Sequence, residues 1–98
     1  MNELKVMIIK EGSYTTCGVV QKISIIKQNW DHFYEPAYDD GEPVIDKDGF
    51  AYYVIYGDYD DLLYANRSKT CITLDEAFDL AINSTDYEII WKEGLLPK

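Results

Sequence analysis

Alternating apolar and polar residues predict a β-hairpin at the start of the chain. Apolar side chains occupy every second position of residues 4–9, which is the period of a strand with two distinct faces. Gly12–Ser13 then indicates a turn. Residues 17–27 are rich in Val and Ile and are expected to pair with the first strand. Residues 50–56 are the strongest strand candidate, and because both of their faces are apolar we expect them to form a central strand.

The last third of the chain predicts a helix followed by a strand. Thr73 and Glu76 have the spacing of a capping box, which indicates a helix over about 73–84. Residues 87–92 alternate again and predict a final strand, and 62–65 are a candidate for a short additional one. One face of the helix carries an apolar stripe made of Leu74, Ala77, Phe78, Ala81 and Ile82.

This order of elements predicts an α+β fold. We expect a mostly antiparallel sheet of four or five strands, with one amphipathic helix packed on one face. The 98 residues suffice for one hydrophobic core, and 47% apolar with 14% aromatic residues argues against a disordered chain. A single domain over 1–98 is therefore expected. Residues 28–49 show no periodicity and predict a long loop, a kind of segment that usually has a function.

The negative charge is concentrated in one part of the sequence. Residues 31–61 contain ten acidic residues and one basic residue, whereas the remaining residues contain eight of each, so this stretch accounts for the net charge of −9. Such a surface disfavours nucleic acids and anionic membranes, and it favours a basic protein as partner. The alternative is that the acids only keep the protein soluble.

The cysteines and the N-terminus indicate a compartment. The first ten residues lack the long apolar core of a signal peptide, and no stretch approaches the 18 apolar residues of a membrane span. We therefore expect a cytoplasmic protein. In that compartment Cys17 and Cys71 are predicted to be reduced thiols located on strands. Two cysteines and one histidine do not suffice for a structural zinc site.

No catalytic motif stands out, and we expect neither an enzyme nor a cofactor. Cys17 with His32 could form a nucleophile and base, but no local signature supports the pair, and His32 is expected on the surface of a polar loop. Phosphate-binding glycine loops are absent from the sequence. The acids in the turns do not have the spacing of an EF-hand, which leaves only weak calcium binding open. These carboxylate pairs are Asp39–Asp40, Asp46 with Asp48, and Asp58 with Asp60–Asp61.

Tyrosines accompany the acidic residues, and two roles are open for them. The tyrosines of 50–56 are expected in the core, whereas those in the acidic loops have the composition of a protein interface. We therefore predict a partner-binding surface that joins loop tyrosines to loop carboxylates. Its members are Tyr34, Tyr38, Asp39, Asp40, Asp58, Tyr59, Asp60 and Asp61.

The chain resembles the small acidic immunity proteins of bacterial polymorphic and contact-dependent toxin systems. The resemblance lies in its size, its Tyr- and Asp-rich middle third and the pattern of residues 72–77 leading to 87–91. It implies a non-enzymatic inhibitor that covers the active site of a basic toxin domain, often a nuclease. Two other functions stay open: a small ligand-binding protein or enzyme with a pocket between sheet and helix, and a structural or regulatory homo-oligomer. Whether the protein is a monomer or a dimer is left open as well.

Overall fold

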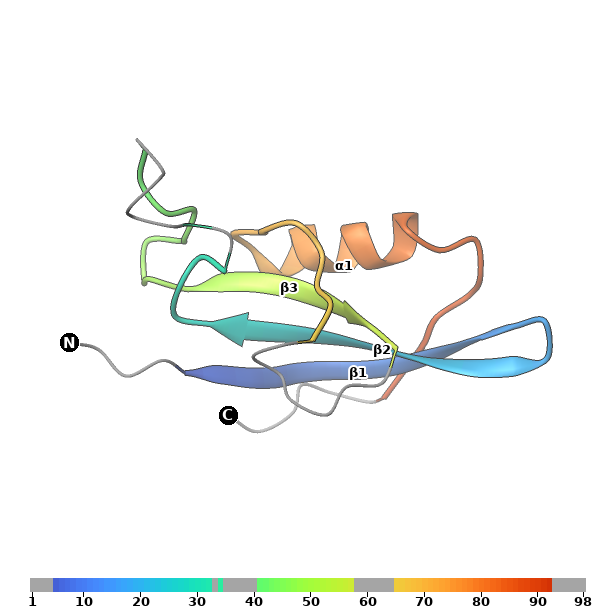
Figure 1. Ribbon diagram of the computed structural model, residues 1–98. Helices are drawn as coiled ribbons and strands as arrows, with labels where there is room; N and C mark the ends of the chain where they lie inside the picture. Colours follow the sequence, from blue (N-terminus) through green and yellow to red (C-terminus); the bar gives the residue numbers. More distant parts are fainter. Residues whose placement is uncertain (1–4, 33, 35–40, 58–64, 93–98) are drawn as a thin grey trace.

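A computed structural model of the chain describes residues 5–32, 34, 41–57 and 65–92. Within them, four antiparallel strands form one sheet that packs against a helix (Figure 1). The predicted α+β class is confirmed. The strands lie in the order β3-β2-β1-β4 across the sheet. In chain order the elements are β1 (Val6–Thr16), β2 (Val19–Gln28), β3 (Ala51–Tyr56), α1 (Leu74–Asn83) and β4 (Ile90–Trp91).

The predicted hairpin is present, but its turn lies elsewhere. Cys17 and Gly18 form a two-residue turn with φ values of 51° and 78°, as in the tight turns that match strand twist. The turn predicted at Gly12–Ser13 is wrong, because Gly12 lies inside β1. A Cβ atom at Gly12 would come within 2.8 Å of a ring carbon of Trp91. This glycine therefore permits a close approach of β4 rather than a turn.

A β-bulge in β1 changes which residues face the helix. The register against β2 shifts between Ile8 and Lys10, so that Ile9 is an extra residue in the strand. Met7 before the bulge and Ile9 in the bulge belong to the core on the helix side, and beyond the bulge Tyr14 does. A strict alternation along β1 would have placed Tyr14 on the other face.

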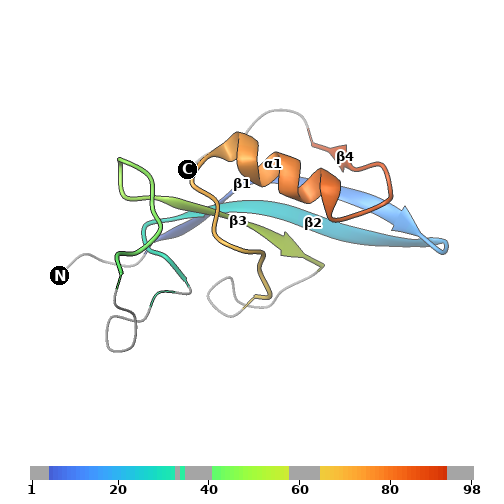
Figure 2. The same ribbon diagram turned by 90° about the horizontal axis from the view of Figure 1, so that it is seen from above.

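The sheet has an apolar cluster on each face, and one of these faces is covered by α1 (Figure 2). Helix α1 packs on one face through Ala77 and Ala81, whose small side chains let the helix come close to Ile23, Ile25 and Val54. The cluster on the face away from α1, here called the loop-side cluster, is smaller. It consists of Ile26, Ala51, Tyr53 and Ile55, with Val6, Ile8, Ile45 and Ala65 packed against it.

Strand β3 is the outermost strand of the sheet, so the prediction of a central position is wrong. Its outer edge is nonetheless paired, because Tyr52 forms an antiparallel bridge with Cys71 and Ile55 forms one with Arg67. Two backbone hydrogen bonds of 2.8 and 3.0 Å join Tyr52 to Cys71. The short strand predicted at 62–65 lies mostly outside the described residues, and Ala65 itself is in a bend.

The helix begins and ends where the sequence predicts. The Glu76 amide donates to Oγ1 of the N-cap Thr73 at 3.0 Å, and the Glu76 carboxylate accepts from the Ile72 amide at 3.2 Å. Ile82, predicted within the apolar stripe, is 54% exposed. At 100° per residue it lies about 120° from the middle of the buried stripe around Ala77 and Ala81.

The last strand is shorter than predicted. Only Ile90 and Trp91 of the expected range 87–92 pair with β1. The expected alternation is nevertheless present here, since Ile89 and Trp91 pack on the helix side while Ile90 is 69% exposed. Tyr87 stacks on Tyr14 at 6.1 Å between ring centroids.

Candidate functional site

Of the predicted binding surface, only Tyr34 lies within the described residues. Tyr34 is described and partly buried, and its amide donates to the Asp31 carbonyl oxygen at 3.2 Å. Whether Tyr34 belongs to one surface with the other predicted residues stays a prediction. Those residues, Tyr38, Asp39, Asp40, Asp58, Tyr59, Asp60 and Asp61, lie outside the described residues.

Asp31 is the centre of a buried polar network. The residue is 8% exposed, and its Oδ1 accepts hydrogen bonds from the hydroxyls of Tyr53 at 3.3 Å and Thr70 at 3.0 Å. Its Oδ2 accepts from the Val44 amide at 2.8 Å. Sequence reasoning counted Asp31 only as one acid among ten. The position of Asp31 could have distinguished it from the other acids. It lies just after the carboxyl end of the buried strand β2, where a side chain can still contact the core.

The Asp31 carboxylate joins two parts of the predicted loop 28–49. It accepts a hydrogen bond from the backbone amide of Val44, thirteen residues further along the chain, and so holds these two parts of the loop together. Through Tyr53 and Thr70 the same carboxylate is tied to β3 and to the segment that pairs with the outer edge of β3. The network thus connects Asp31 and Val44, which lie in the predicted loop 28–49, to β3 and to Thr70.

His32 and Arg67 complete this network. The His32 amide donates to the Tyr53 hydroxyl at 2.8 Å, and the imidazole meets the Tyr53 ring edge-on. The Arg67 guanidinium lies 5.4 Å from the Tyr53 ring centroid and donates to the Gln28 side chain. His32 is therefore neither fully buried nor fully exposed: it lies in a loop, as predicted, and its ring also contacts Tyr53 of the network.

Burial dominates the protonation behaviour of the network. It raises the pKa of Tyr53 and lowers the pKa of Arg67. It also lowers the pKa of His32, with the Arg67 charge acting in the same direction and the Asp31 charge opposing it. In each of the three groups, burial thus disfavours the charged form.

A pocket of about 310 Å³ lies beside Asp31 and is here called the Trp30 pocket. Two aromatic residues, Trp30 and Tyr34, form part of its lining, and the Trp30 carbonyl is held by the Gln28 side-chain amide at 3.1 Å. Among the described residues, the lining consists of Asn29, Trp30, Asp31, Tyr34, Pro43 and Ile45.

The other described acids of the loop have separate roles. Oδ1 of Asp46 accepts from the amides of Asp48 and Phe50, both at 2.9 Å, and so shapes the turn before β3. Glu42 and Asp48 are exposed. Asp46 is therefore a structural residue of a turn.

The sulfur and imidazole groups are not brought together. Cys17 is exposed in the hairpin turn and not on a strand as predicted, whereas Cys71 is buried. Strand β2 with its ten residues separates Cys17 from His32, a length of about 30 Å at roughly 3.3 Å per residue. These two residues cannot act as nucleophile and base in one site.

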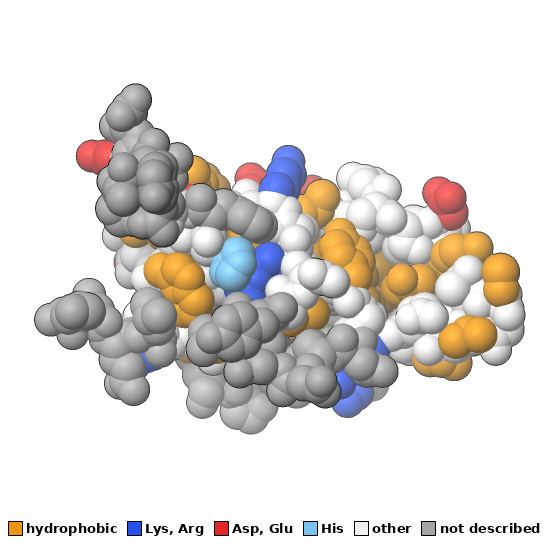
Figure 3. All heavy atoms as spheres, viewed as in Figure 1, with side chains coloured by type: hydrophobic (Ala, Val, Ile, Leu, Met, Phe, Trp, Pro, Cys, Tyr) orange, Lys and Arg blue, Asp and Glu red, His pale blue; other side chains and the backbone are white. Residues whose placement is uncertain are grey.

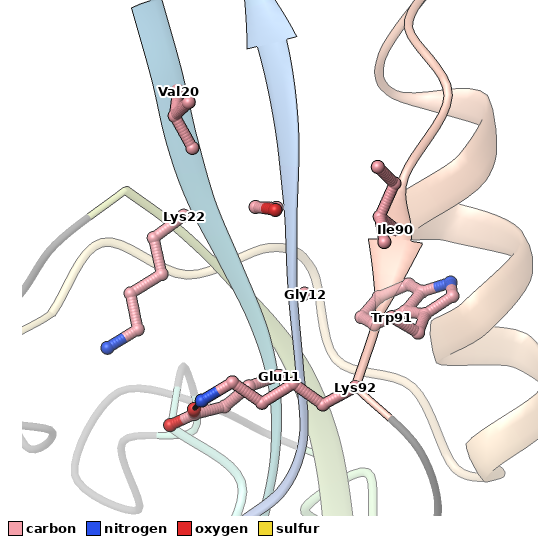
Figure 4. A pocket seen from close by; sticks show the side chains of 8 residues that line it. Glu11, Gly12, Val20, Lys22, Ile90, Trp91 and Lys92 are labelled. Carbon is pink, nitrogen blue, oxygen red and sulfur yellow. Dashed lines mark hydrogen bonds and ion pairs between the residues drawn. The ribbon is translucent and has the colours of Figure 1, made fainter.

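A second, open groove of about 630 Å³ lies on the sheet face away from α1 (Figure 4). Val20 and Ile90 are 68% and 69% exposed there, and Figure 3 shows apolar side chains gathered at the hairpin end. Lys92 pairs with Glu11 at 2.8 Å and lowers the pKa of this carboxyl. Neither the groove nor the Trp30 pocket lies between sheet and helix. The groove is lined by Glu11, Gly12, Ser13, Val20, Lys22, Ile90, Trp91 and Lys92.

The remaining findings concern metals, membranes and related proteins. Among the described residues, no group of three or more His, Cys, Asp or Glu side chains is placed to hold a metal ion. Within the described part of the chain, helix α1 lacks the length and apolar character needed to cross a bilayer. No family model, no curated protein and no solved structure matches the chain.

Proposed function

We propose that the protein is a non-enzymatic, cytoplasmic protein-binding module, an immunity-type inhibitor that binds a basic toxin domain. The concentration of ten acids and one base in residues 31–61 supports a cationic partner. A protein surface of this kind attracts a basic protein over a distance of about a Debye length and holds it through aromatic contacts. Tyr34 and the other loop tyrosines would provide those contacts.

The observation that carries the proposal is that described residues next to two acid-rich segments, 35–42 and 58–61, pack on one face. Ile45 lies after the first segment and Ala65 after the second, and both pack on the loop-side cluster, on the face away from α1. Asp31, which lies before the first segment, binds Val44 after it and Tyr53 of β3. Anchoring at one face supports a shared binding surface rather than charges scattered for solubility.

Capture experiments with charge variants test the proposal. The tagged protein is incubated with lysate of its source cells, and the captured proteins are identified and eluted with salt. In the test variant, Asp58, Asp60 and Asp61 are changed to Asn. In the matched control, three exposed acids outside 31–61 are changed to amides: Asp79, Asp86 and Glu88. Both variants gain the same three units of charge.

We expect wild type and control to capture a basic protein that elutes at high salt and is lost from the test variant. Expression of that protein alone should arrest growth, and co-expression with this chain should restore it. Equal capture by both variants, or capture of neutral and acidic proteins only, would refute the acidic surface. A captured protein that is harmless when expressed alone would refute the immunity role.

A further inference from the structure

The open groove on the sheet face away from α1 brings together the two most exposed large apolar side chains of the described residues. Ile90 is 69% exposed and Val20 is 68% exposed, and both line the groove. Single exposed apolar residues need no explanation, whereas a pair beside one hollow indicates a binding surface. We propose that this groove, here called the Ile90 groove, is the interface of a dimer of this chain. The inference goes beyond the proposed function, because it concerns another surface and another partner.

The strand register explains the shape of the Ile90 groove. Ser13 in β1 lies directly opposite Lys22 in β2 on one side and Ile90 in β4 on the other, so the three side chains share one face. Because the serine side chain is the shortest of the three, the middle of this row is low and its two sides are high. Figure 4 shows Val20 and Lys22 on one side of β1 and Ile90 on the other. An apolar side chain from the rim of a second copy fits into such a hollow.

The charges of the Ile90 groove are compatible with those of its own copy. A two-fold dimer brings the same patch of both copies face to face, so a patch with charges of one sign would repel itself. The groove is lined by Lys22, Lys92 and Glu11, and Lys92 is already paired with Glu11 at 2.8 Å. Charged groups of both signs beside an exposed apolar pair match the polar rim and apolar centre of protein interfaces.

The distribution of charge favours a second copy over another kind of partner. Residues 31–61, with ten acids and one base, would repel the same stretch of a second copy, whereas the rest of the chain has eight of each. A basic partner attracted by the acidic stretch gains no attraction from a groove lined by two lysines and one glutamate. The Ile90 groove is thus a surface on which two copies can meet without repulsion.

Sedimentation equilibrium of the purified protein tests the inference. The groove has eight lining residues, fewer than the roughly 20–30 on each side of a standard interface, so the dimer should be reversible. We expect the average mass to rise from the monomer value of 11.3 kDa toward twice that value between about 10 µM and 1 mM protein. Raising NaCl from about 50 to 500 mM should lower the dissociation constant at least about threefold, because salt screens the repulsion between two chains of net charge −9.

Three lysine variants separate the Ile90 groove from other apolar sites. Val20→Lys and Ile90→Lys should each raise the dissociation constant at least about tenfold, because each places a charge at the apolar centre of the interface. The matched control is Ile82→Lys, at a residue of α1 that is 54% exposed, and it should dimerise as well as the wild type. Each variant changes the net charge from −9 to −8, so added repulsion between the copies does not explain a loss of dimer.

Nuclear magnetic resonance on the wild type locates the interface without a substitution. When the ¹⁵N-labelled protein is diluted, the amide signals of Ser13, Val20 and Ile90 should shift together, and that of Ile82 should stay in place. This measurement keeps the inference testable even where a lysine variant does not fold.

Several results would overturn the inference. These are a monomer at all concentrations, a dimer that tolerates both groove variants, and dilution shifts at other residues only. A dimer that salt weakens would also overturn it, because its contacts would then be ionic. The proposed function is tested separately by the capture of a basic protein, which weakens with salt and needs the acids of 31–61, so either proposal can fail while the other stands.

Discussion

Replacing Gly12 by alanine should loosen the contact between β1 and β4. A Cβ atom there would lie 2.8 Å from a ring carbon of Trp91 and 2.9 Å from the Ile90 carbonyl oxygen, both closer than folded proteins allow. Because one of these atoms belongs to the backbone, β4 has to move. Overpacking of this kind costs about 1–3 kcal/mol, and the loss of glycine flexibility offsets about 0.5–1 kcal/mol of it.

We therefore expect Gly12→Ala to lower the free energy of unfolding by about 1–2 kcal/mol. For a chain of this length that corresponds to a fall in Tm of roughly 5–15 °C. The Lys92 amide, which donates to the Glu11 carbonyl oxygen at 2.9 Å, should exchange faster with solvent. Thermal unfolding and amide exchange measure the two effects.

The matched control is Gly41→Ala. A Cβ atom at Gly41 meets nothing within 4 Å, and its φ is not in the left-handed region, so this variant should be neutral or up to about 1 kcal/mol more stable. If Gly12→Ala is as stable as Gly41→Ala, with unchanged exchange of the Lys92 amide, then the close approach of β4 to Gly12 is wrong.

Three further predictions concern the polar network and the helix. Tyr53→Phe should lower the free energy of unfolding, measured in urea, by about 1–3 kcal/mol, because the buried Asp31 carboxylate loses a hydrogen-bond donor. Tyr56→Phe should lower it by less than about 1 kcal/mol, because the Tyr56 hydroxyl donates to Ser84 at an exposed site. The pKa of His32 is lowered in the folded state, so below pH about 6.5 the unfolded chain takes up a proton that the folded chain resists. Stability should therefore fall with decreasing pH through this window, and the fall should be smaller in His32→Gln; equal pH profiles would contradict the assignment. Thr73→Ala should cost about 0.5–2 kcal/mol through loss of the N-cap, and a neutral result would mean that the cap does not form.

Local patterns in the sequence were sufficient for the helix and for the presence of the hairpin. The capping box at Thr73 uses residues three positions apart, so its signal is complete within one turn of chain. The position of the hairpin turn could not be predicted from local sequence. Gly12 is a typical turn residue, and only the approach of Trp91, far along the chain, explains why a glycine is needed inside a strand. The bulge at Ile9 likewise depends on pairing with β2.

The candidate site likewise has a part that could be predicted from the sequence and a part that could not. Counting charges was enough to identify the acidic residues 31–61, because a count needs no knowledge of contacts. It could not distinguish Asp31, whose carboxylate is buried by Tyr53 and Thr70 from distant segments, from Glu42, which is exposed. Composition treats these acids alike, whereas their environment makes one a structural anchor.

The proposed attraction between the acidic surface and a basic partner is tested by the association rate with the captured, purified partner at about 50 and 500 mM NaCl. Electrostatic steering predicts a rate that falls at least about tenfold across this range, with a much smaller change in the dissociation rate. An association rate that is the same at both salt concentrations, for wild type and for the variant with Asp58, Asp60 and Asp61 changed to Asn, would contradict the account.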